Sequence, residues 1–455
     1  MLRNRSSSPA ANQKNFRQVS GFTATCLLIS NVVGSGIFTT TGFMVRDVGD
    51  PWLILLLWVV GALLALAGAV CYSELGTALP MVGGEYIYLR HAYSPFLGFL
   101  SGWASFTVGF GAAIAAGAVS FSSYLLQLIS PNIEPLMVSK VLALGLVWTF
   151  TAVHVAGVGP GGLVQQILTV LKVGLILGLI TAAFALGNGN WTNMTPPKPV
   201  TDPSFGVMFV SLIFVIYAYS GWNTAGYIAG EMTNPERNIP RTMIGGTLLV
   251  GLLYLALNLV YFYALPVSAI ATPPLLPVAE KASVALFGPM AGYFVTVMLC
   301  ISIAGSVSAM IWAGPRVYYA MAKDGLFPAF FSKTRGVGGA PQRSIILQSL
   351  WATILILSGT FEQLVIYSGV ILAFFTALAV GAVIVLRYRN PQLVRPYKVP
   401  LYPFVPALYI MVSVMIVIYT GMERPTESAW AMATVLTGIP LYFLMRPAIG
   451  DNRSA

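Results

Sequence analysis

The feature that most constrains the fold is an apolar stretch that is long enough to cross a membrane but is interrupted in its middle. Residues 19–45 carry no charged side chain, and a membrane-spanning helix needs about 20 apolar residues. The centre of the stretch reads Gly34-Ser35-Gly36, which propagates a helix poorly. Backbone groups freed by such a break are tolerated at membrane depth only where protein or an aqueous cavity covers them. The break therefore marks either a close helix–helix contact or a binding site.

The composition of the chain excludes a soluble protein. Of its 455 residues, 57% are hydrophobic and 8% are charged, whereas soluble domains carry about 25% charged residues. Apolar runs of this length predict membrane-spanning helices and not the alternating strands of a barrel. Cys26, Cys71 and Cys300 lie in or beside apolar runs and predict neither a disulfide framework nor a metal site. The net charge of +10 fits inner loops that face anionic lipid, so no nucleic-acid partner is expected.

Twelve apolar segments predict an all-α polytopic membrane protein. They cover about residues 20–44, 51–74, 95–129, 136–155, 162–186, 206–230, 242–265, 288–321, 344–358, 365–386, 402–421 and 429–445. The transmembrane domain is expected to cover residues 19–447. Residues 1–18 are expected to be a disordered cytoplasmic tail, and residues 448–455 a cytoplasmic C-terminal tail.

The basic residues predict the orientation of the segments in a plasma or inner membrane. With the N-terminus inside, most of the 24 Lys and Arg residues fall on the inner side. The exceptions are Arg46, Lys140, Lys198, Lys281 and Arg424 on the outer side and Lys172 within a segment. Cytoplasmic loops of membrane proteins are enriched in Lys and Arg, so both termini are expected to be cytoplasmic.

A second interrupted helix lies in the sixth apolar segment. Residues 217–226 read YAYSGWNTAG, where Ser220, Gly221 and Asn223 interrupt an apolar run. If the first ten segments form repeats over about residues 19–187 and 206–387, the two breaks occupy equivalent places, and segments eleven and twelve follow over about 402–446. A matched pair of interrupted segments is typical of inverted-repeat transporters, in which the breaks face each other near the membrane midplane. This pairing favours a substrate site over a helix-packing notch.

The exposed backbone at two such breaks suits a zwitterionic amino acid. A broken helix presents free N–H groups at a positive dipole end and free C=O groups at a negative one. The substrate carboxylate is expected at the N–H groups of Ser35, Gly36 and Ile37. The ammonium is expected at carbonyls of the breaks, such as those of Tyr217 and Ser220. Glycine at positions 34 and 36 lets a ligand approach the main chain closely.

An ordered set of motifs carries a family resemblance along nearly the whole chain. The motifs are VGSGIF (33–38), YSELG (72–76), PMVGGEYIYLR (80–90), YAYSGWN (217–223), EMTNPERNIPR (231–241) and KDGLFP (323–328). The chain resembles the amino acid–polyamine–organocation superfamily, and within it most closely the L-type amino acid transporters and their bacterial relatives. The resemblance implies the leucine-transporter fold: twelve transmembrane helices, built as two inverted five-helix repeats plus two, that work by alternating access.

The resemblance also implies which residues contact the substrate. It places an aromatic gate at Tyr217, where the family pattern more often has Phe, and a side-chain pocket at Ile37, Tyr217, Phe110 and Met310. The remaining substrate-binding residues expected at the two breaks are Val33, Gly34, Ser35, Gly36, Ala218, Ser220 and Gly221. In family members joined to a heavy subunit, a cysteine after the third span makes the link. Residues 130–135 contain none, so no disulfide-linked heavy subunit is expected, and the oligomeric state stays open.

Lys172 is the most informative single residue, because it lies about ten positions from either end of an apolar segment. A charge at that depth is costly and marks function. In the resembling family this lysine sits where sodium-coupled relatives place a sodium ion. It is therefore expected to be the coupling residue and to tie the fifth segment to the first break. Two roles remain open, a fixed cation or a proton carrier, since burial favours the neutral form of lysine.

Other polar residues give weaker indications. For a group of residues at the inner helix ends, gate or structural ion pairs are favoured over the alternative of direct substrate contact; the group comprises Glu74, Glu85, Arg90, Glu231 and Arg237. Asn258 either faces the cavity or bonds a neighbouring helix.

These observations predict a secondary transporter of neutral L-amino acids, either a sodium-independent exchanger or a proton-coupled permease. The four segments expected around the site carry no charge, and a charged substrate side chain would need an opposite one. The alternatives are a cationic amino acid or polyamine transporter of the same superfamily and, from other classes, a channel or a membrane-embedded enzyme. No catalytic residue, cofactor or metal ligand is identified.

Overall fold

The computed structural model describes residues 18–129, 136–195, 204–272, 277–334, 339–358 and 361–445. Nearly all of these residues lie in helices, and the described ranges contain no strand, only a parallel bridge between Val19 and Met232. The predicted tails, apart from Gln18, and the loop at residues 130–135 lie outside the described residues. The expectation that this loop links to no heavy subunit therefore stays a prediction.

The lengths and compositions of the helices confirm the all-α polytopic prediction. Ten helical stretches in the described ranges are long and apolar enough to cross a membrane: Gly21–Val48, Pro51–Ala78, Pro95–Ile129, Met137–Ala156, Val158–Leu186, Pro235–Ala264, Pro289–Lys323, Gly369–Arg389, Phe404–Glu423 and Ser428–Met445. Two shorter apolar helices, Phe205–Tyr219 and Gln342–Leu357, correspond to the sixth and ninth predicted segments. The sixth is short because its helix stops at the predicted break.

Several of the twelve segments are divided into shorter helices. The first half contains α2 (Gly21–Val32), α3 (Gly36–Val48), α4 (Pro51–Ala78), α5 (Glu85–Ala92), α6 (Pro95–Ala104), the π-helical turn η1 (Ser105–Phe110), α7 (Gly111–Ile129), α8 (Leu136–Ala156), α9 (Val158–Leu186) and η2 (Trp191–Met194). The middle contains α10 (Phe205–Tyr219), α11 (Thr224–Tyr227), η3 (Ala229–Glu231), α12 (Pro235–Pro240), the π-helical turn η4 (Arg241–Gly245), α13 (Gly246–Ala264), α14 (Val267–Ala271) and α15 (Val278–Phe287). The last part contains α16 (Pro289–Ala313), α17 (Pro315–Lys323), η5 (Ala329–Ser332), α18 (Gln342–Ser358), α19 (Phe361–Arg389), α20 (Phe404–Glu423) and α21 (Pro425–Met445).

Local sequence signals explain where helices begin and end around the first break. Gly49 adopts a left-handed conformation with φ of 71° and ends α3. Asp50 then caps α4, because its side chain accepts hydrogen bonds from the N–H groups of Trp52 and Leu53, and Pro51 takes the first helical position. Together they turn the chain sharply from the first segment into the second.

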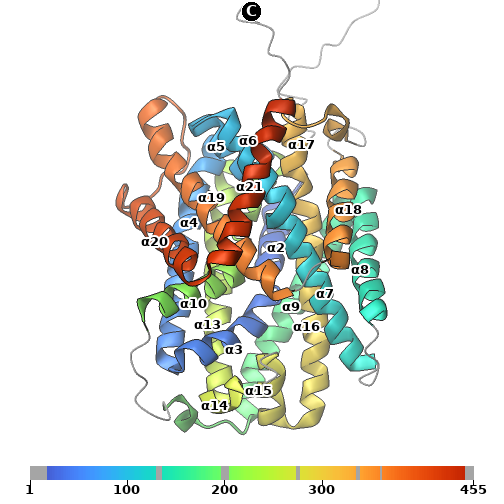
Figure 1. The fold of residues 1–455 in the computed structure, drawn as a ribbon. Coiled ribbons are helices and arrows are strands. Elements are labelled where there is room, and N and C mark those ends of the chain that lie inside the picture. The colour runs from blue at the N-terminus through green and yellow to red at the C-terminus, as the bar shows by residue number, and fades with distance from the viewer. Residues whose placement is uncertain are drawn as a thin grey trace, which may run out of the picture.

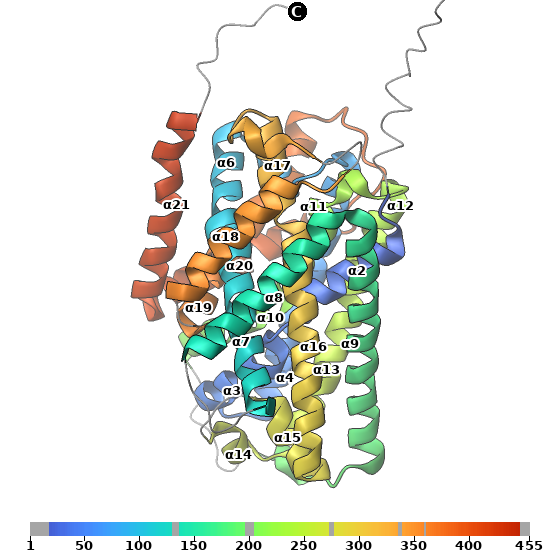
Figure 2. The ribbon, with the colours of Figure 1, turned by 90° about the vertical axis from the view of Figure 1, so that its right-hand side faces the viewer.

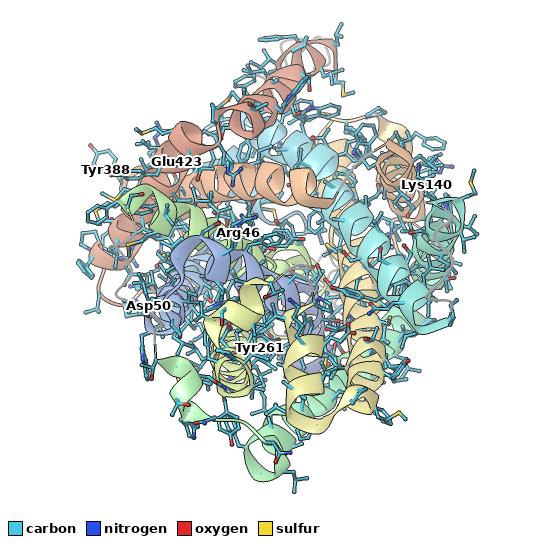
Figure 3. The ribbon with its side chains drawn as sticks, turned by 60° about the horizontal axis from the view of Figure 1, so that its bottom comes forward. Arg46, Asp50, Lys140, Tyr261, Tyr388 and Glu423 are labelled. Atoms are coloured by element: carbon cyan, nitrogen blue, oxygen red, sulfur yellow. The ribbon has the colours of Figure 1, made fainter. Side chains whose placement is uncertain are left out.

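The helices form an elongated bundle with two distinct ends. Figure 1 shows α5, α6 and α17 at one end, here called the α5–α17 end, and α14 and α15 at the other, the α14–α15 end. Figure 2 shows α9 and α16 running side by side, with α21 at the edge of the bundle. Figure 3 looks toward the α14–α15 end, where Arg46 and Asp50 are labelled. α2 and α10 contact several other spans, and this central position brings the two breaks together.

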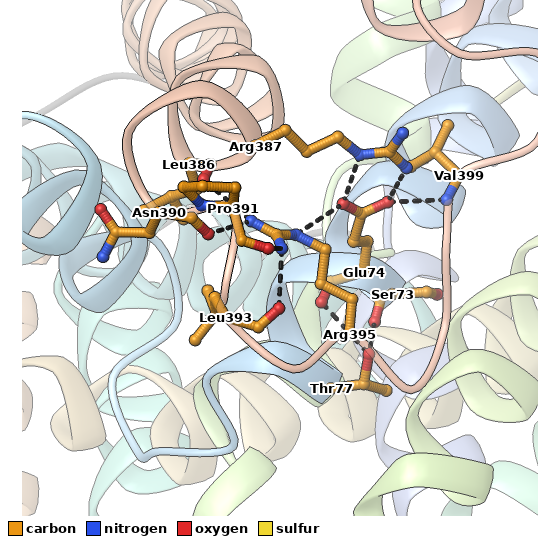
Figure 4. A network of polar contacts seen from close by, with 10 residues as sticks. All are labelled: Ser73, Glu74, Thr77, Leu386, Arg387, Asn390, Pro391, Leu393, Arg395 and Val399. Atoms are coloured by element: carbon orange, nitrogen blue, oxygen red, sulfur yellow. Dashed lines mark hydrogen bonds and ion pairs between the residues drawn. The ribbon is translucent and has the colours of Figure 1, made fainter.

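Ion pairs fasten helices at the α5–α17 end, as predicted for Glu74, Arg90 and Glu231. Figure 4 shows the largest cluster, in which Glu74 of α4 accepts hydrogen bonds from Arg387 of α19 and from the Val399 N–H, with Arg395 3.5 Å away. Arg90 pairs with Asp324. Arg316 of α17 donates to both carboxylate oxygens of Glu231, each at 2.8 Å. These contacts join the second, sixth, eighth and tenth segments at one end of the bundle.

Candidate functional site

The first span is broken where the sequence predicts. α2 ends at Val32, α3 begins at Gly36, and residues 33–35 between them are not helical. Gly34 is confined, since a Cβ there would lie 3.0 Å from Ser306 Oγ. Gly36 is confined more tightly, because a Cβ would lie 2.8 Å from the Ala218 Cα of α10. Glycine at position 36 therefore lets the first break approach the main chain of the second.

Protein side chains satisfy the carbonyl side of this break. The last carbonyls of a helix have no partner in the helix itself. Here the Ser306 hydroxyl donates to the Asn31 carbonyl at 3.3 Å, and the Tyr254 hydroxyl lies 2.8 Å from the Val32 carbonyl and 3.0 Å from that of Ala218. Tyr254 thus touches the ends of both broken helices. The unwound backbone is accordingly stable at membrane depth without water on this side.

Lys172 supplies the remaining hydrogen bonds to the carbonyl side. Its ammonium, on α9, donates to the Val33 carbonyl at 2.6 Å and to the Ser30 carbonyl at 3.1 Å, with Ser30 Oγ at 3.3 Å. The Ser302 hydroxyl also donates to the Val33 carbonyl, at 3.2 Å. The lysine is fully buried, and its amine lies at the negative dipole end of α2, where a positive charge is favoured. Lys172 therefore connects the fifth segment to the first break by hydrogen bonds, as expected.

The N–H side of the same break has no such partners. In the described part of the chain, the N–H groups of Ser35, Gly36 and Ile37 donate no hydrogen bond outside their own helix, and the geometry of a first turn gives them none inside it. Ser35 makes no side-chain cap for α3. Free N–H groups at the positive end of a helix favour an anionic group such as a carboxylate.

The second break faces the first across short contacts. α10 ends at Tyr219, and Gly221 adopts a φ of 106°, which suits glycine and few other residues. A Cβ on Gly221 would meet the Asn31 side chain at 2.8 Å, and Asn31 donates to Thr224 Oγ1 at 2.6 Å. The Ser220 carbonyl accepts no hydrogen bond from the residues described here, so it remains available to a ligand.

A cavity of about 100 Å³ lies between the two breaks. Of the predicted substrate-binding residues, it is lined by Gly34, Ser35, Gly36, Phe110, Tyr217, Ala218, Ser220, Gly221 and Met310. The π-helical turn η1 carries Phe110 to its wall, and such turns are common at functional sites. The Tyr217 side chain lies within hydrogen-bonding reach of the Ser35 side chain, so it spans the two breaks.

Two predicted substrate-binding residues, Val33 and Ile37, do not line the cavity. The expected side-chain pocket is therefore corrected at Ile37. Val33 contributes its carbonyl to Lys172 and not its side chain to the cavity. The Ile37 side chain is fully buried in the hydrophobic core. Successive positions of a helix face directions about 100° apart, so Gly36 faces the cavity and Ile37 turns away from it. Asn258 also bonds neighbouring residues, because it accepts from Thr41 at 2.6 Å.

Sequence analysis missed one charged residue of this cavity. Glu85, expected in an ion pair at the inner helix ends, instead lines the cavity wall and is 3% exposed. Tyr72 and Asn223 donate to its carboxylate at 2.8 and 2.7 Å. The signal that could have found it is the pair of glycines before it, since Gly84 has a φ of 54° and turns α5 back into the bundle.

A helical membrane protein whose two broken spans meet around a central cavity has the architecture of a secondary transporter. The comparison with known families agrees with this class and makes it specific. The model of the amino acid permease family matches residues 19–440, so the chain belongs to that family and has its leucine-transporter-like polytopic fold. Members of this family are transporters and not enzymes.

Characterised relatives cover nearly the same length. The chain is 31% identical over 427 residues to the serine/threonine exchanger SteT of Bacillus subtilis, covering 93% of this chain and 95% of the relative. It is 28% identical over 433 residues to the Asc-type amino acid transporter 1 of Mus musculus, covering 93% and 80%. It is also 28% identical over 431 residues to the mouse large neutral amino acids transporter small subunit 2, with 93% and 80% covered.

Proposed function

We propose that this protein transports neutral L-amino acids by alternating access, without sodium, as an exchanger or a proton-coupled permease. The observation that carries the proposal is the asymmetry of the first break. Its carbonyls are held by Lys172 and neighbouring hydroxyls, whereas the N–H groups of Ser35 to Ile37 have no such partner among the described residues, and Ser35 and Gly36 line the cavity. This arrangement fits a substrate carboxylate at the N–H groups, with the Ser220 carbonyl available to the ammonium.

The cavity walls support a neutral substrate side chain. Phe110, Met310, Ile303 and Phe375 contribute apolar surface, which suits an uncharged side chain. Among the described residues that line the cavity, one is charged, Glu85. Its carboxylate already accepts hydrogen bonds from Tyr72 and Asn223. A cationic substrate would have to compete with those donors.

The charge distribution supports an orientation with the α5–α17 end in the cytoplasm. Arg90, Arg316 and Arg387 lie at this end, and the side that is richer in Lys and Arg faces inward. Both termini are then cytoplasmic, in a plasma or inner membrane, and no disulfide-linked heavy subunit is needed. The repeats would run over about residues 19–187 and 206–387, each beginning with a broken span.

Exchange in proteoliposomes tests the proposal. Vesicles containing the purified protein and loaded with unlabelled L-serine should take up labelled L-serine, L-alanine or L-leucine faster than unloaded vesicles, with or without sodium. Arginine, lysine, glutamate and putrescine should compete poorly. Protein-free vesicles are the control for leakage. Strong competition by arginine or glutamate together with weak competition by every neutral amino acid would refute neutral specificity, and uptake that depends steeply on sodium would refute the coupling.

A further inference from the structure

Glu85 stands out among the cavity residues because it is a buried carboxylate with no cation beside it. Its carboxylate accepts from Tyr72 of α4 at 2.8 Å and from Asn223 of the second break at 2.7 Å, and the Tyr227 hydroxyl is within hydrogen-bonding reach. None of the ion pairs among the described residues includes Glu85. A charged group buried without a partner of opposite charge is unfavourable, so such a group binds a cation or a proton readily.

Among the side chains that the structure describes, the surroundings of Glu85 contain hydroxyls and amides but no basic group. The titratable groups that face it are Tyr72 of α4, Tyr88 of α5, Tyr227 of α11 and Tyr409 of α20. α6 has no titratable residue, and the last-turn arginines of α19 are engaged with Glu74 and with the Ala92 carbonyl. Burial raises the pKa of the Glu85 carboxyl above its usual value, while the hydrogen bonds from Tyr72, Asn223 and Tyr227 oppose that rise.

Glu85 also joins two parts of the bundle. It begins α5, which packs on α6 and α19, and its donors belong to α4 and to the second break. An ionised carboxylate accepts hydrogen bonds from all of these donors. Tyr72 and Asn223 both donate to Oε1, and a proton on Oε2 makes the carboxyl neutral and therefore a weaker acceptor of these two hydrogen bonds. The charge of Glu85 therefore controls a contact between α5 and the second break.

We propose that Glu85 is a proton-binding site in the wall of the substrate cavity, and that proton binding from the cytoplasm weakens the contact between α5 and the second break and favours opening of the cavity at the α5–α17 end. The inference rests on the proposed transport function and on its orientation. It assigns the proton to a residue other than Lys172, which lies behind the first break and does not line the cavity. The proton comes from cytoplasmic water and returns to it when the contact re-forms.

Transport of labelled L-serine into proteoliposomes at several internal pH values tests the proposal. Wild-type exchange should rise as the internal pH is lowered, because burial favours the protonated form of the Glu85 carboxyl. Glu85→Gln should abolish this dependence, because the amide cannot bind the proton. Glu280→Gln is the matched control: Glu280 is another partly buried carboxylate that accepts from an amide, Gln127 at 3.1 Å, but it does not line the cavity. Its pH profile should match the wild type.

Tyr72→Phe provides a second test in a variant that keeps the aromatic ring. Loss of one hydrogen bond to the charged form should shift the midpoint of the pH profile upward by about one unit, a tenfold gain in proton affinity. Infrared difference spectra between acidic and neutral buffer supply a readout independent of transport. The wild type and Glu280→Gln should share a protonated-carboxyl band that Glu85→Gln lacks.

Any of several results would overturn the proposal. They include a wild-type pH profile in Glu85→Gln, an unshifted midpoint in Tyr72→Phe, and an infrared band that survives in Glu85→Gln. A changed preference for arginine or lysine in Glu85→Gln with an unchanged pH profile would also overturn it, and would make Glu85 a substrate ligand. If the wild type exchanges no amino acid at any pH, the proposed transport function fails, whereas the infrared band still decides whether Glu85 binds a proton.

Discussion

Replacing Lys172 by methionine should reduce transport severely while leaving the protein folded. The Ser30 carbonyl has no other donor among the described residues, and an unsatisfied buried acceptor costs about 1–3 kcal/mol. The Val33 carbonyl keeps the Ser302 hydroxyl and loses about 1 kcal/mol. The total of about 2–4 kcal/mol destabilises the geometry of the first break, which corresponds to a roughly 30- to 1000-fold loss of transport.

Global stability should change much less than transport, because methionine also removes the cost of burying an ammonium. The assay is exchange of labelled L-serine in proteoliposomes, beside the apparent melting temperature of each purified variant. Lys281→Met is the control, since Lys281 also donates to a carbonyl, that of Thr272, but at the α14–α15 end. Lys172→Met transport near the wild-type rate would refute the reasoning, as would a wild-type requirement for sodium.

The same contact can be disturbed from the opposite helix. A Cβ on Gly305 of α16 would lie 2.8 Å from Ser30 Oγ and 3.2 Å from the Lys172 ammonium, so Gly305→Ala should displace the lysine without removing it. Lys172→Arg keeps the charge, but its larger guanidinium meets the same limited space. Both variants should resemble Lys172→Met. Full activity of Lys172→Arg would show that the charge alone suffices.

Three further variants probe the breaks and the ion-pair cluster. Gly36→Val should lose binding of labelled L-serine far more than Ser35→Ala does. A Cβ at position 36 meets the Ala218 main chain, whereas Ser35 is expected to bind the substrate through its N–H group, which alanine keeps. Equal losses of binding in the two variants would contradict this. Gly221→Ala should cost about 1–3 kcal/mol through its positive φ, measured as a lower melting temperature, and an unchanged value would argue against the observed turn. Glu74→Gln should lower the melting temperature by several degrees, because it leaves two partly buried arginines without their carboxylate partner at a cost of about 2 kcal/mol; wild-type stability would make the cluster dispensable.

The broken spans could be predicted from the sequence because helix propagation depends on local residue types. Glycine and serine at positions 34–36 and 220–221 interrupt runs that are otherwise apolar, and the helices end within a residue or two of those positions. The depth of Lys172 also followed from counting residues along one segment. Family, fold class and the nature of the site rest on these local features and on the order of the motifs.

The partners of the broken backbone depended on tertiary packing. The donors to four successive carbonyls of the first span come from α9, α13 and α16, segments more than 130 positions further along the chain, and no local pattern pairs them. Ile37 and Gly36 are neighbours in sequence, yet the helix rotation at α3 puts only Gly36 at the cavity. Glu85 follows a helix end and looked like a surface ion-pair residue. Only the turn of α5 into the bundle buried it beside the second break, because burial is a property of the packed chain and not of the sequence around a residue.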